Sequence, residues 1–229
     1  MNRDLSEIIK TYATKTHIDV NKALLEKSKD SLIAMFNDLL TIYINDKNSS
    51  TIREFVTVNL AGYNHSTNKI GYNGYKHSSE IGGKALKCEA KPKNFDTSNY
   101  FAKKKEGKSL AKINGGGNFT DYTIARFEKD KTENPHLLVS GFVDGRLIYI
   151  FEFPFTSLGF TQNLQNQLEK HFTNGDEKNK YLRSASFDYK NWIESENLKI
   201  VYLLEAGELQ EYKEYINQKF YQWMLLKIK

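Results

Sequence analysis

The stretch that decides the fold is Lys84-Ala85-Leu86-Lys87-Cys88-Glu89-Ala90-Lys91-Pro92. Side chains of a β-strand alternate between its two faces. One face of this strand therefore carries the polar residues, Lys87, Glu89 and Lys91. The other face carries the apolar residues, Leu86, Cys88 and Ala90. Such a strand anchors its apolar back in a core and presents a carboxylate beside an ammonium group. Because Pro92 has no N–H for a ladder, we expect the strand to end there.

Further strands are expected on both sides of this stretch. Residues 69–76 predict a strand that pairs with residues 84–91 across a turn at 77–83. Residues 137–143 and 146–155 predict a hairpin around Asp144-Gly145, a dipeptide that favours tight turns between apolar runs. Residues 199–204 predict a buried strand. Together with the expected helices, these strands predict an α/β fold in which a mixed β-sheet is flanked by helices.

Helical spacing of apolar residues occurs over residues 19–45 and 157–173, and again from about Glu208 to the end. A further helix is expected from Thr51 to about Gly62, where Thr51 and Glu54 fit a capping box. A short one is expected from Thr120 to about Lys131, after an irregular and basic segment at 95–118. A chain of 229 residues without a linker predicts a single domain with an N-terminal helical part over about residues 1–62.

The composition is that of a globular chain, with 39% hydrophobic and 27% charged residues. No stretch reaches the roughly 18 apolar residues that a membrane span requires. The first five residues lack an apolar signal core, and the single cysteine, Cys88, cannot form an internal disulfide. These features predict a soluble, cytoplasmic protein.

The formal net charge is +5, and the basic residues concentrate in the middle of the chain. This segment contains Lys84, Lys87, Lys91, Lys93, Lys103, Lys104, Lys105, Lys108, Lys112 and Arg126. Such a concentration is expected where a protein contacts a phosphate backbone. The alternative is a solvated basic face without a partner.

Glu89 and Lys91 are the candidates for chemistry. Magnesium prefers oxygen ligands and takes one or two carboxylates from a protein, and a nearby lysine stabilises charge that develops on a phosphate. The alternative for the pair is an ion pair on a solvated face. The same spacing recurs at Glu106–Lys108, Glu211–Lys213 and Asp188–Lys190, of which the last is the strongest rival because its neighbours suit a strand.

Two segments then resemble the active-site hairpin of the PD-(D/E)XK restriction endonucleases. They are Lys69-Ile70-Gly71-Tyr72-Asn73-Gly74-Tyr75 and Cys88-Glu89-Ala90-Lys91-Pro92-Lys93-Asn94. The run Asn114-Gly115-Gly116-Gly117-Asn118-Phe119-Thr120-Asp121-Tyr122 is also similar to segments of such enzymes. The resemblance covers about residues 50–155. It implies a restriction-endonuclease-like core and magnesium-dependent hydrolysis of double-stranded DNA at a short specific sequence by a homodimeric type II enzyme.

One position departs from the family, which has an acidic residue on the first strand where this chain has Asn73. A hairpin centred near Ile81 sets Asn73 opposite Glu89, and Glu54 is a further candidate carboxylate. The resemblance thus implies catalysis by Glu89 and Lys91 with Asn73, and metal binding by Glu89, Asn73 and Glu54. Contact with DNA is expected from Lys93, Asn94, Lys112, Asn118 and Arg126.

Other functions remain open at this stage. A catalytically disabled DNA-binding protein on the same fold would explain Asn73, and a nuclease of repair or RNA processing would use the same chemistry. The five histidines lack metal-ligand spacing, which argues against a zinc enzyme. The run Gly115–Gly117 either lets the backbone approach a phosphate or forms a flexible loop.

Overall fold

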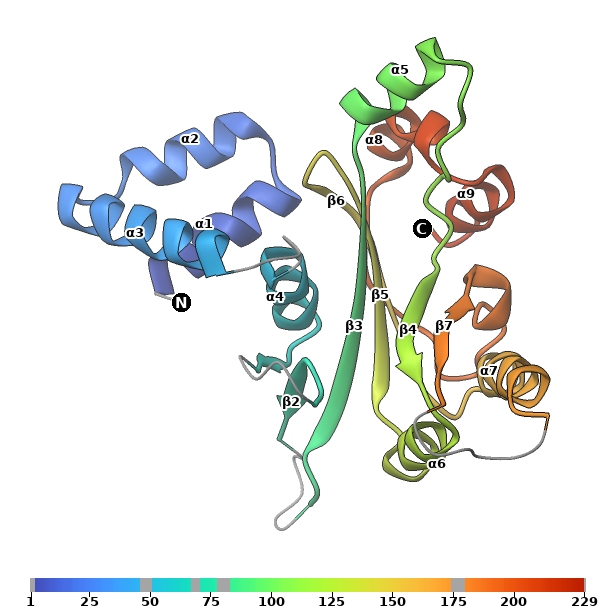
Figure 1. Cartoon of the computed structure of the whole chain (residues 1–229). Coiled ribbons are helices and arrows are strands. Elements are labelled where there is room, and N and C mark those ends of the chain that lie inside the picture. The colour runs from blue at the N-terminus through green and yellow to red at the C-terminus, as the bar shows by residue number, and fades with distance from the viewer. Residues whose placement is uncertain (1–2, 46–50, 67–70, 78–82, 174–179, 229) are drawn as a thin grey trace.

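The computed structural model describes residues 3–45, 51–66, 71–77, 83–173 and 180–228 (Figure 1). Its main sheet has six strands, and only the pair β3–β5 is parallel. In spatial order the strands are β1 (Asn64–His65), β2 (Gly74–Lys76), β3 (Leu86–Phe95), β5 (His136–Val143), β6 (Arg146–Pro154) and β8 (Lys199–Leu203). The expected α/β fold with a mixed sheet and flanking helices is therefore confirmed.

One face of the main sheet is covered by a second, two-stranded sheet and three helices (Figure 1). The small sheet pairs β4 (Gly117–Tyr122) with β7 (Leu182–Phe187), and the helices are α6 (Ile124–Glu133), α7 (Leu158–His171) and α9 (Gln218–Leu225). Fully buried aromatic side chains fill this layer, among them Phe119, Phe155, Phe160, Trp192 and Phe220. This is the principal hydrophobic core.

The opposite face is covered by α4 (Thr51–Leu60), which forms close to the expected bounds. Val58 of α4 packs in one cluster with Cys88 and Ala90 of β3 and with Leu138 of β5. The apolar back of β3 therefore faces α4, as the alternation of its residues predicts. Glu89 and Lys91 face the other layer, toward β4 and α6.

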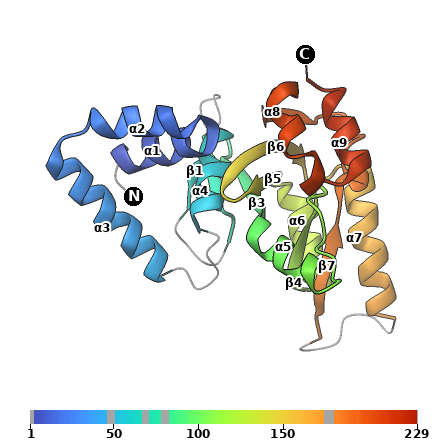
Figure 2. The same cartoon turned by 90° about the horizontal axis from the view of Figure 1, so that it is seen from above.

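Three further helices, α1 (Arg3–Thr14), α2 (His17–Leu25) and α3 (Lys29–Asn45), lie beyond α4 on the same side of the sheet (Figure 2). The prediction of one helix over residues 19–45 was wrong, because the helix is interrupted between Leu25, where α2 ends, and Lys29, where α3 begins. Ser28 accounts for the new start, since its Oγ accepts a hydrogen bond from the Ser31 N–H at 3.2 Å. The helix α1 was not predicted individually, although it lies within the N-terminal helical part expected over about residues 1–62.

The hairpin formed by β5 and β6 is confirmed. Asp144 and Gly145 both have positive φ, 46° and 81°. Two successive residues of that kind define the turn whose twist matches a two-residue hairpin. This hairpin fixes β5 beside β3, since β5 pairs with β3 along residues 88–95.

The prediction that β3 ends at Pro92 was wrong, because the strand continues to Phe95. β2 pairs with β3 only at residues 86–88, so the later part of that edge has no strand partner among the described residues. Pro92 lies two residues after Ala90 and directs its nitrogen to the same edge. The missing N–H therefore removes no ladder bond.

Other boundaries also differ from expectation. The segment at 95–118 contains α5 (Thr97–Lys105), which starts where the Asp96 carboxylate caps the Asn99 N–H. The short helix starts at Ile124 instead of Thr120 because β4 precedes it. The C-terminal helix is divided into α8 (Ala206–Glu211), the 3-10 turn η2 (Lys213–Tyr215) and α9.

Two expected strands are also revised. β8 is an outer, half-exposed strand and not a buried one. In the described part of the strand expected at 69–76, which is residues 71–76, only residues 74–76 form a strand. Residues 67–70 and 78–82, including Glu80, lie outside the described part of the chain. Among the helices that the structure describes, none has both the length and the apolar character to cross a bilayer.

Candidate active site

The candidate site is built on the polar face of β3. Lys91 donates a hydrogen bond from Nζ to Oε1 of Glu89 at 2.7 Å. Both side chains are partly shielded, with exposed fractions of 17% for Lys91 and 10% for Glu89. Their carboxylate and ammonium groups therefore form a hydrogen-bonded ion pair that is mostly shielded from solvent. They do not lie on an open, solvated face, where ion pairs are weak.

β4 lies directly on this pair. The Nζ of Lys91 is 4.4 Å from the ring centre of Phe119 on β4, a cation–π distance. A Cβ added at Gly117 would lie 2.9 Å from Cβ of Lys91, so only glycine lets the two strands approach this closely. Gly117 thus positions β4 against the polar face of β3.

The glycine run has neither of the roles expected for it. Gly115, Gly116 and Gly117 are all buried. A Cβ at Gly115 would meet Trp192 at 2.7 Å, and one at Gly116 would meet the Phe187 carbonyl at 2.4 Å. The run packs tightly inside the protein, so it is neither a flexible loop nor open to a phosphate.

Arg126 on α6 brings a second cation to Glu89. Its guanidinium lies 3.8 Å from Oε1 of Glu89 and 3.7 Å from Oδ2 of Asp130. The same guanidinium stacks over the rings of Phe119 and Tyr122, at 5.7 and 5.5 Å. Arg126 keeps 42% of its side chain exposed, so one side of the group remains available to a ligand.

Asp130, a residue absent from the sequence-based candidates, holds Arg126 in place. It is buried and accepts hydrogen bonds from the hydroxyls of Tyr72 at 3.1 Å and Tyr122 at 2.9 Å. Burial raises the pKa of Asp130 above its usual value, although the hydrogen bonds from Tyr122 and Tyr72 and the charge of Arg126 act in the opposite direction. The only signal in the sequence was its spacing of four residues from Arg126 on a helix.

Lys87 closes the polar face at the start of β3. Its Nζ donates to Oε2 of Glu133 on α6 at 2.6 Å and lies 5.1 Å from the ring centre of Tyr72. The hydrogen bond from Lys87 holds the pKa of Glu133 below its usual value. Lys87 therefore has a structural ion pair with α6, unlike Lys91, whose partner is on its own strand.

Asn73 lies next to the site, but its side chain has a different set of partners. Its Oδ1 accepts a hydrogen bond from the Ala90 N–H at 2.8 Å, and its Nδ2 donates to Oε2 of Glu54 at 3.2 Å. Continuing the β2–β3 register, which pairs Gly74 with Cys88, does set Asn73 across from Glu89. The amide nevertheless caps the free edge of β3 and reaches toward α4.

The residues predicted to bind metal thus fall into two neighbouring groups. Glu54 and Asn73 form one group, and Glu89 is bonded to Lys91 with Arg126 nearby. Within the described ranges, no cluster of three or more His, Cys, Asp and Glu residues is arranged to hold a metal ion. Glu89 alone fits magnesium that keeps several waters and binds substrate phosphates, because such magnesium needs few protein carboxylates.

The five residues expected to contact DNA have different surroundings. Lys93 is exposed, yet the surrounding protein removes enough water to lower the pKa of its ammonium group. Lys112 and Asn118 are exposed, and Arg126 is half-exposed beside Glu89. Asn94, in contrast, uses its Oδ1 to accept the Gly145 N–H at 3.1 Å and so ties β3 to the hairpin turn.

The rival spacings do not lie on strands. Asp188 follows β7 and caps the 3-10 turn η1 (Tyr189–Asn191), where its carboxylate accepts the Lys190 N–H at 2.9 Å. Glu106 and Lys108 form an exposed ion pair after α5, and Glu211 ends α8. Of these four acid–lysine pairs, Glu89 and Lys91 are the pair that lies on a strand, with both side chains on the same face.

Comparison with known proteins gives no further lead to the class of this chain. No protein-family model matches the sequence, and no curated protein matches it at a significant level.

Proposed function

We propose that this chain is a magnesium-dependent endonuclease of the PD-(D/E)XK kind that cuts double-stranded DNA at a short specific sequence, as type II restriction enzymes do. The observation that carries the proposal is the shielded Glu89–Lys91 pair on one face of β3, with Arg126 beside it. The resemblance of the two hairpin segments to that family supports the same conclusion. The proposal also includes a restriction-endonuclease-like core.

The roles of the residues follow from their chemistry. A magnesium ion at Glu89 would polarise the scissile phosphate and activate a water molecule. Lys91, released from its bond to Glu89, would donate to a phosphate oxygen as charge develops there. Arg126 would hold a neighbouring phosphate oxygen with its exposed N–H groups, since guanidinium groups match phosphate geometry.

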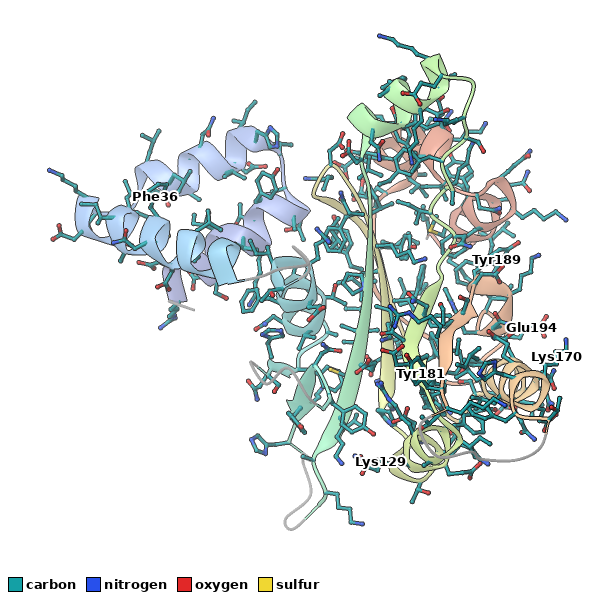
Figure 3. The ribbon with its side chains drawn as sticks, viewed as in Figure 1. Phe36, Lys129, Lys170, Tyr181, Tyr189 and Glu194 are labelled. Atoms are coloured by element: carbon teal, nitrogen blue, oxygen red, sulfur yellow. The ribbon has the colours of Figure 1, made fainter. Side chains whose placement is uncertain are left out.

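The proposed enzyme acts as a homodimer, because two sites related by a twofold axis cut both strands of a symmetric sequence. Large apolar side chains exposed on α2 and α3 support this part of the proposal, and Phe36 lies among them on the helical part (Figure 3). They are Ile18, Leu25, Leu32, Ile33, Phe36 and Leu39. Sedimentation of the protein with and without Phe36→Ser and Ile33→Ser tests this interface.

A second candidate is a DNA-binding protein that has lost catalysis. The engagement of Asn73 by Glu54 and by the Ala90 N–H favours it, because an uncharged residue occupies the position of the expected metal ligand. A nuclease of repair or RNA processing remains the third candidate, on the chemistry of Glu89 and Lys91 alone.

Digestion of plasmid DNA with magnesium distinguishes these candidates. Discrete fragments support the restriction enzyme, and a smear indicates a nonspecific nuclease. Retarded but uncut DNA indicates the binding protein, while cleavage of RNA alone indicates RNA processing. Glu89→Gln is the matched control, since it keeps the shape of the side chain and removes its charge. If neither binding nor cutting of any nucleic acid is detected, the proposal is wrong.

A further inference from the structure

The two-stranded sheet of β4 and β7, here called the ribbon, has an outer face that the proposed catalytic site does not use. Asn118 lies opposite Ser186, and Thr120 lies opposite Ser184. All four side chains are exposed, whereas Phe119, Ala185 and Phe187 alternate with them and are buried. The ribbon therefore presents a short array of amide and hydroxyl groups to solvent.

The ribbon is held rigidly. Both backbone groups of Ser186 on β7 bond to Gln167 on α7, since the N–H donates to Oε1 at 2.9 Å and the carbonyl accepts from Nε2 at 2.7 Å. Asn163 of α7 donates to the same carbonyl at 2.9 Å. This edge of β7 is thus closed at Ser186, where an added peptide strand would have to pair.

The ribbon is also fixed relative to the catalytic strand. Gly117 of β4 packs against Lys91 of β3, and the Phe119 ring lies under the Lys91 ammonium group. In Figure 1, β7 lies on the side of β4 that is away from the main sheet. Any ligand that the ribbon recognises is therefore held at a defined distance from Glu89 and Lys91.

The chemistry of the outer face suits nucleic acid better than protein. Protein interfaces are enriched in aromatic side chains at their centres, but β4 and β7 carry none of the large exposed hydrophobic residues of the described chain. Asparagine, serine and threonine are side chains that hydrogen-bond to base edges, and a two-stranded β-ribbon fits the major groove of DNA.

Basic residues around the ribbon complement a phosphate backbone. Arg183 on β7 is 80% exposed and pairs with the half-exposed Asp121 at 3.0 Å. Arg126 lies in the first turn of α6, the helix that follows β4, and Lys112 is exposed shortly before β4. A neutral polar face bordered by exposed cations matches base edges bordered by phosphates.

We infer that the outer face of the ribbon reads base edges in the major groove of the DNA that Glu89 and Lys91 cut, with Asn118, Thr120, Ser184 and Ser186 as the reading residues. This inference rests on the proposed function. Asn118 reads an adenine, since an asparagine amide pairs with N6 and N7 of that base. Its contact with Oγ of Ser184, at 3.3 Å, is long and is exchanged for the base.

A selection from random duplexes tests the inference. Duplexes with a random central segment are incubated with the full-length protein and Ca²⁺ in place of Mg²⁺, and those retained are sequenced. The unchanged protein should enrich a short sequence containing adenine. Asn118→Ala should reduce the preference at one adenine position by about 5- to 150-fold, which is the discrimination of one good bidentate contact. The double variant Ser184→Ala and Ser186→Ala should weaken the preference at adjacent positions.

Controls separate the possible failures. Gln165→Ala, an exposed change on α7 away from the ribbon, should leave the enriched sequence unchanged. Circular dichroism checks that each variant folds, and Asn118→Ser replaces Asn118→Ala if the latter does not. If the enriched sequence is unchanged in both ribbon variants, the inference is wrong and the proposed function stands. Duplex binding by the unchanged protein without any sequence preference contradicts both the inference and the site-specific cleavage of the proposed function. Failure of the unchanged protein to bind any duplex overturns both.

Discussion

The guanidinium of Arg126 lies 3.8 Å from Oε1 of Glu89, the carboxylate that would bind magnesium. The free protein thus places a fixed cation next to its candidate metal ligand. A second carboxylate, Asp130, keeps the guanidinium there, and two tyrosine hydroxyls hold Asp130. Metal binding has to compete with this internal cation.

Removing the charge at Arg126 should therefore strengthen metal binding in the absence of DNA. A repulsion of about 1 kcal/mol between a bound cation and the guanidinium predicts roughly fivefold tighter binding of Mg²⁺ or Mn²⁺ by Arg126→Gln. Isothermal titration calorimetry measures it. Lys129→Gln, on the exposed side of the same helix, is the control and should have no effect. Equal affinity in all three proteins would mean that Arg126 moves aside without cost.

Loss of either member of the Glu89–Lys91 pair should abolish cleavage. We expect Glu89→Gln and Lys91→Ala to lower the cleavage rate at least about 100-fold, the usual effect of removing a group that stabilises developing charge. Lys87→Ala is the matched control on the same face of β3, and its rate should change only a few-fold because Lys87 pairs with Glu133. Initial rates on a supercoiled plasmid measure all three, and parental rates in both site variants would exclude this site.

Asn73→Asp should make stability depend on magnesium. The change puts a carboxylate against Oε2 of Glu54, where the amide now donates at 3.2 Å. Like charges at this distance destabilise the metal-free protein, so its Tm should fall and Mg²⁺ should restore it. The variant should also need a lower magnesium concentration for cleavage than the parent does. Thermal unfolding with and without Mg²⁺ measures the effect.

Two further variants, Asn73→Ala and Glu54→Ala, distinguish the possible causes of the effect of Asn73→Asp. Asn73→Ala loses both hydrogen bonds and should lower Tm without any rescue by Mg²⁺. If Asn73→Asp leaves cleavage unchanged and Glu54→Ala abolishes it, then Glu54 completes the site without a charge at position 73. No response of activity to either change would remove Asn73 and Glu54 from the site.

Gly117→Ala should disturb the contact between β4 and β3. The new Cβ would lie 2.9 Å from Cβ of Lys91 and 2.7 Å from the ring of Phe187. Overpacking of this kind costs about 1–3 kcal/mol, which corresponds to a fall in Tm of roughly 3–10 °C for a chain of this size. Calorimetry measures the change, with Gly207→Ala as the control because nothing lies within 4 Å of its added Cβ.

Acid should weaken the protein through Glu152. Burial acts to raise the pKa of Glu152, but hydrogen bonds from His136 and Tyr63 and the charges of His136 and Lys199 outweigh it, so the pKa lies below the usual 4.5. A lowered carboxyl pKa contributes stability above about pH 4.5 that is lost as the pH falls through the pKa of the folded state. The difference in urea midpoint between the parent and Glu152→Gln should therefore shrink from pH 6 to pH 3. A constant difference would contradict this assignment.

The sequence predicts the parts of the structure that depend on local patterns. The alternation along β3 assigns Glu89 and Cys88 to opposite faces, and Asp144-Gly145 marks the hairpin turn. The prediction that β3 ends at Pro92 failed, because a proline interrupts a strand only if a partner strand pairs with the edge to which its nitrogen points. A local rule has no information about such a partner.

The rest of the site depends on contacts between distant residues. Asp130 acquires its role from Tyr72, which lies 58 residues earlier in the chain, and no periodicity records that contact. The amide of Asn73 turns to Glu54 because the two are brought together by the packing of α4. The sequence did not predict β7, because this strand contains serines and none of the β-branched residues that strands favour.

The burial of Cys88 has a practical consequence for studying this protein in solution. It is the single cysteine of the chain, its side chain is fully inaccessible, and burial raises the pKa of its thiol. A maleimide or disulfide reagent therefore reacts only when α4 or β2 moves away from β3. The labelling rate of the unmodified protein thus reports how often the strand that carries Glu89 is uncovered, without a probe having to be engineered.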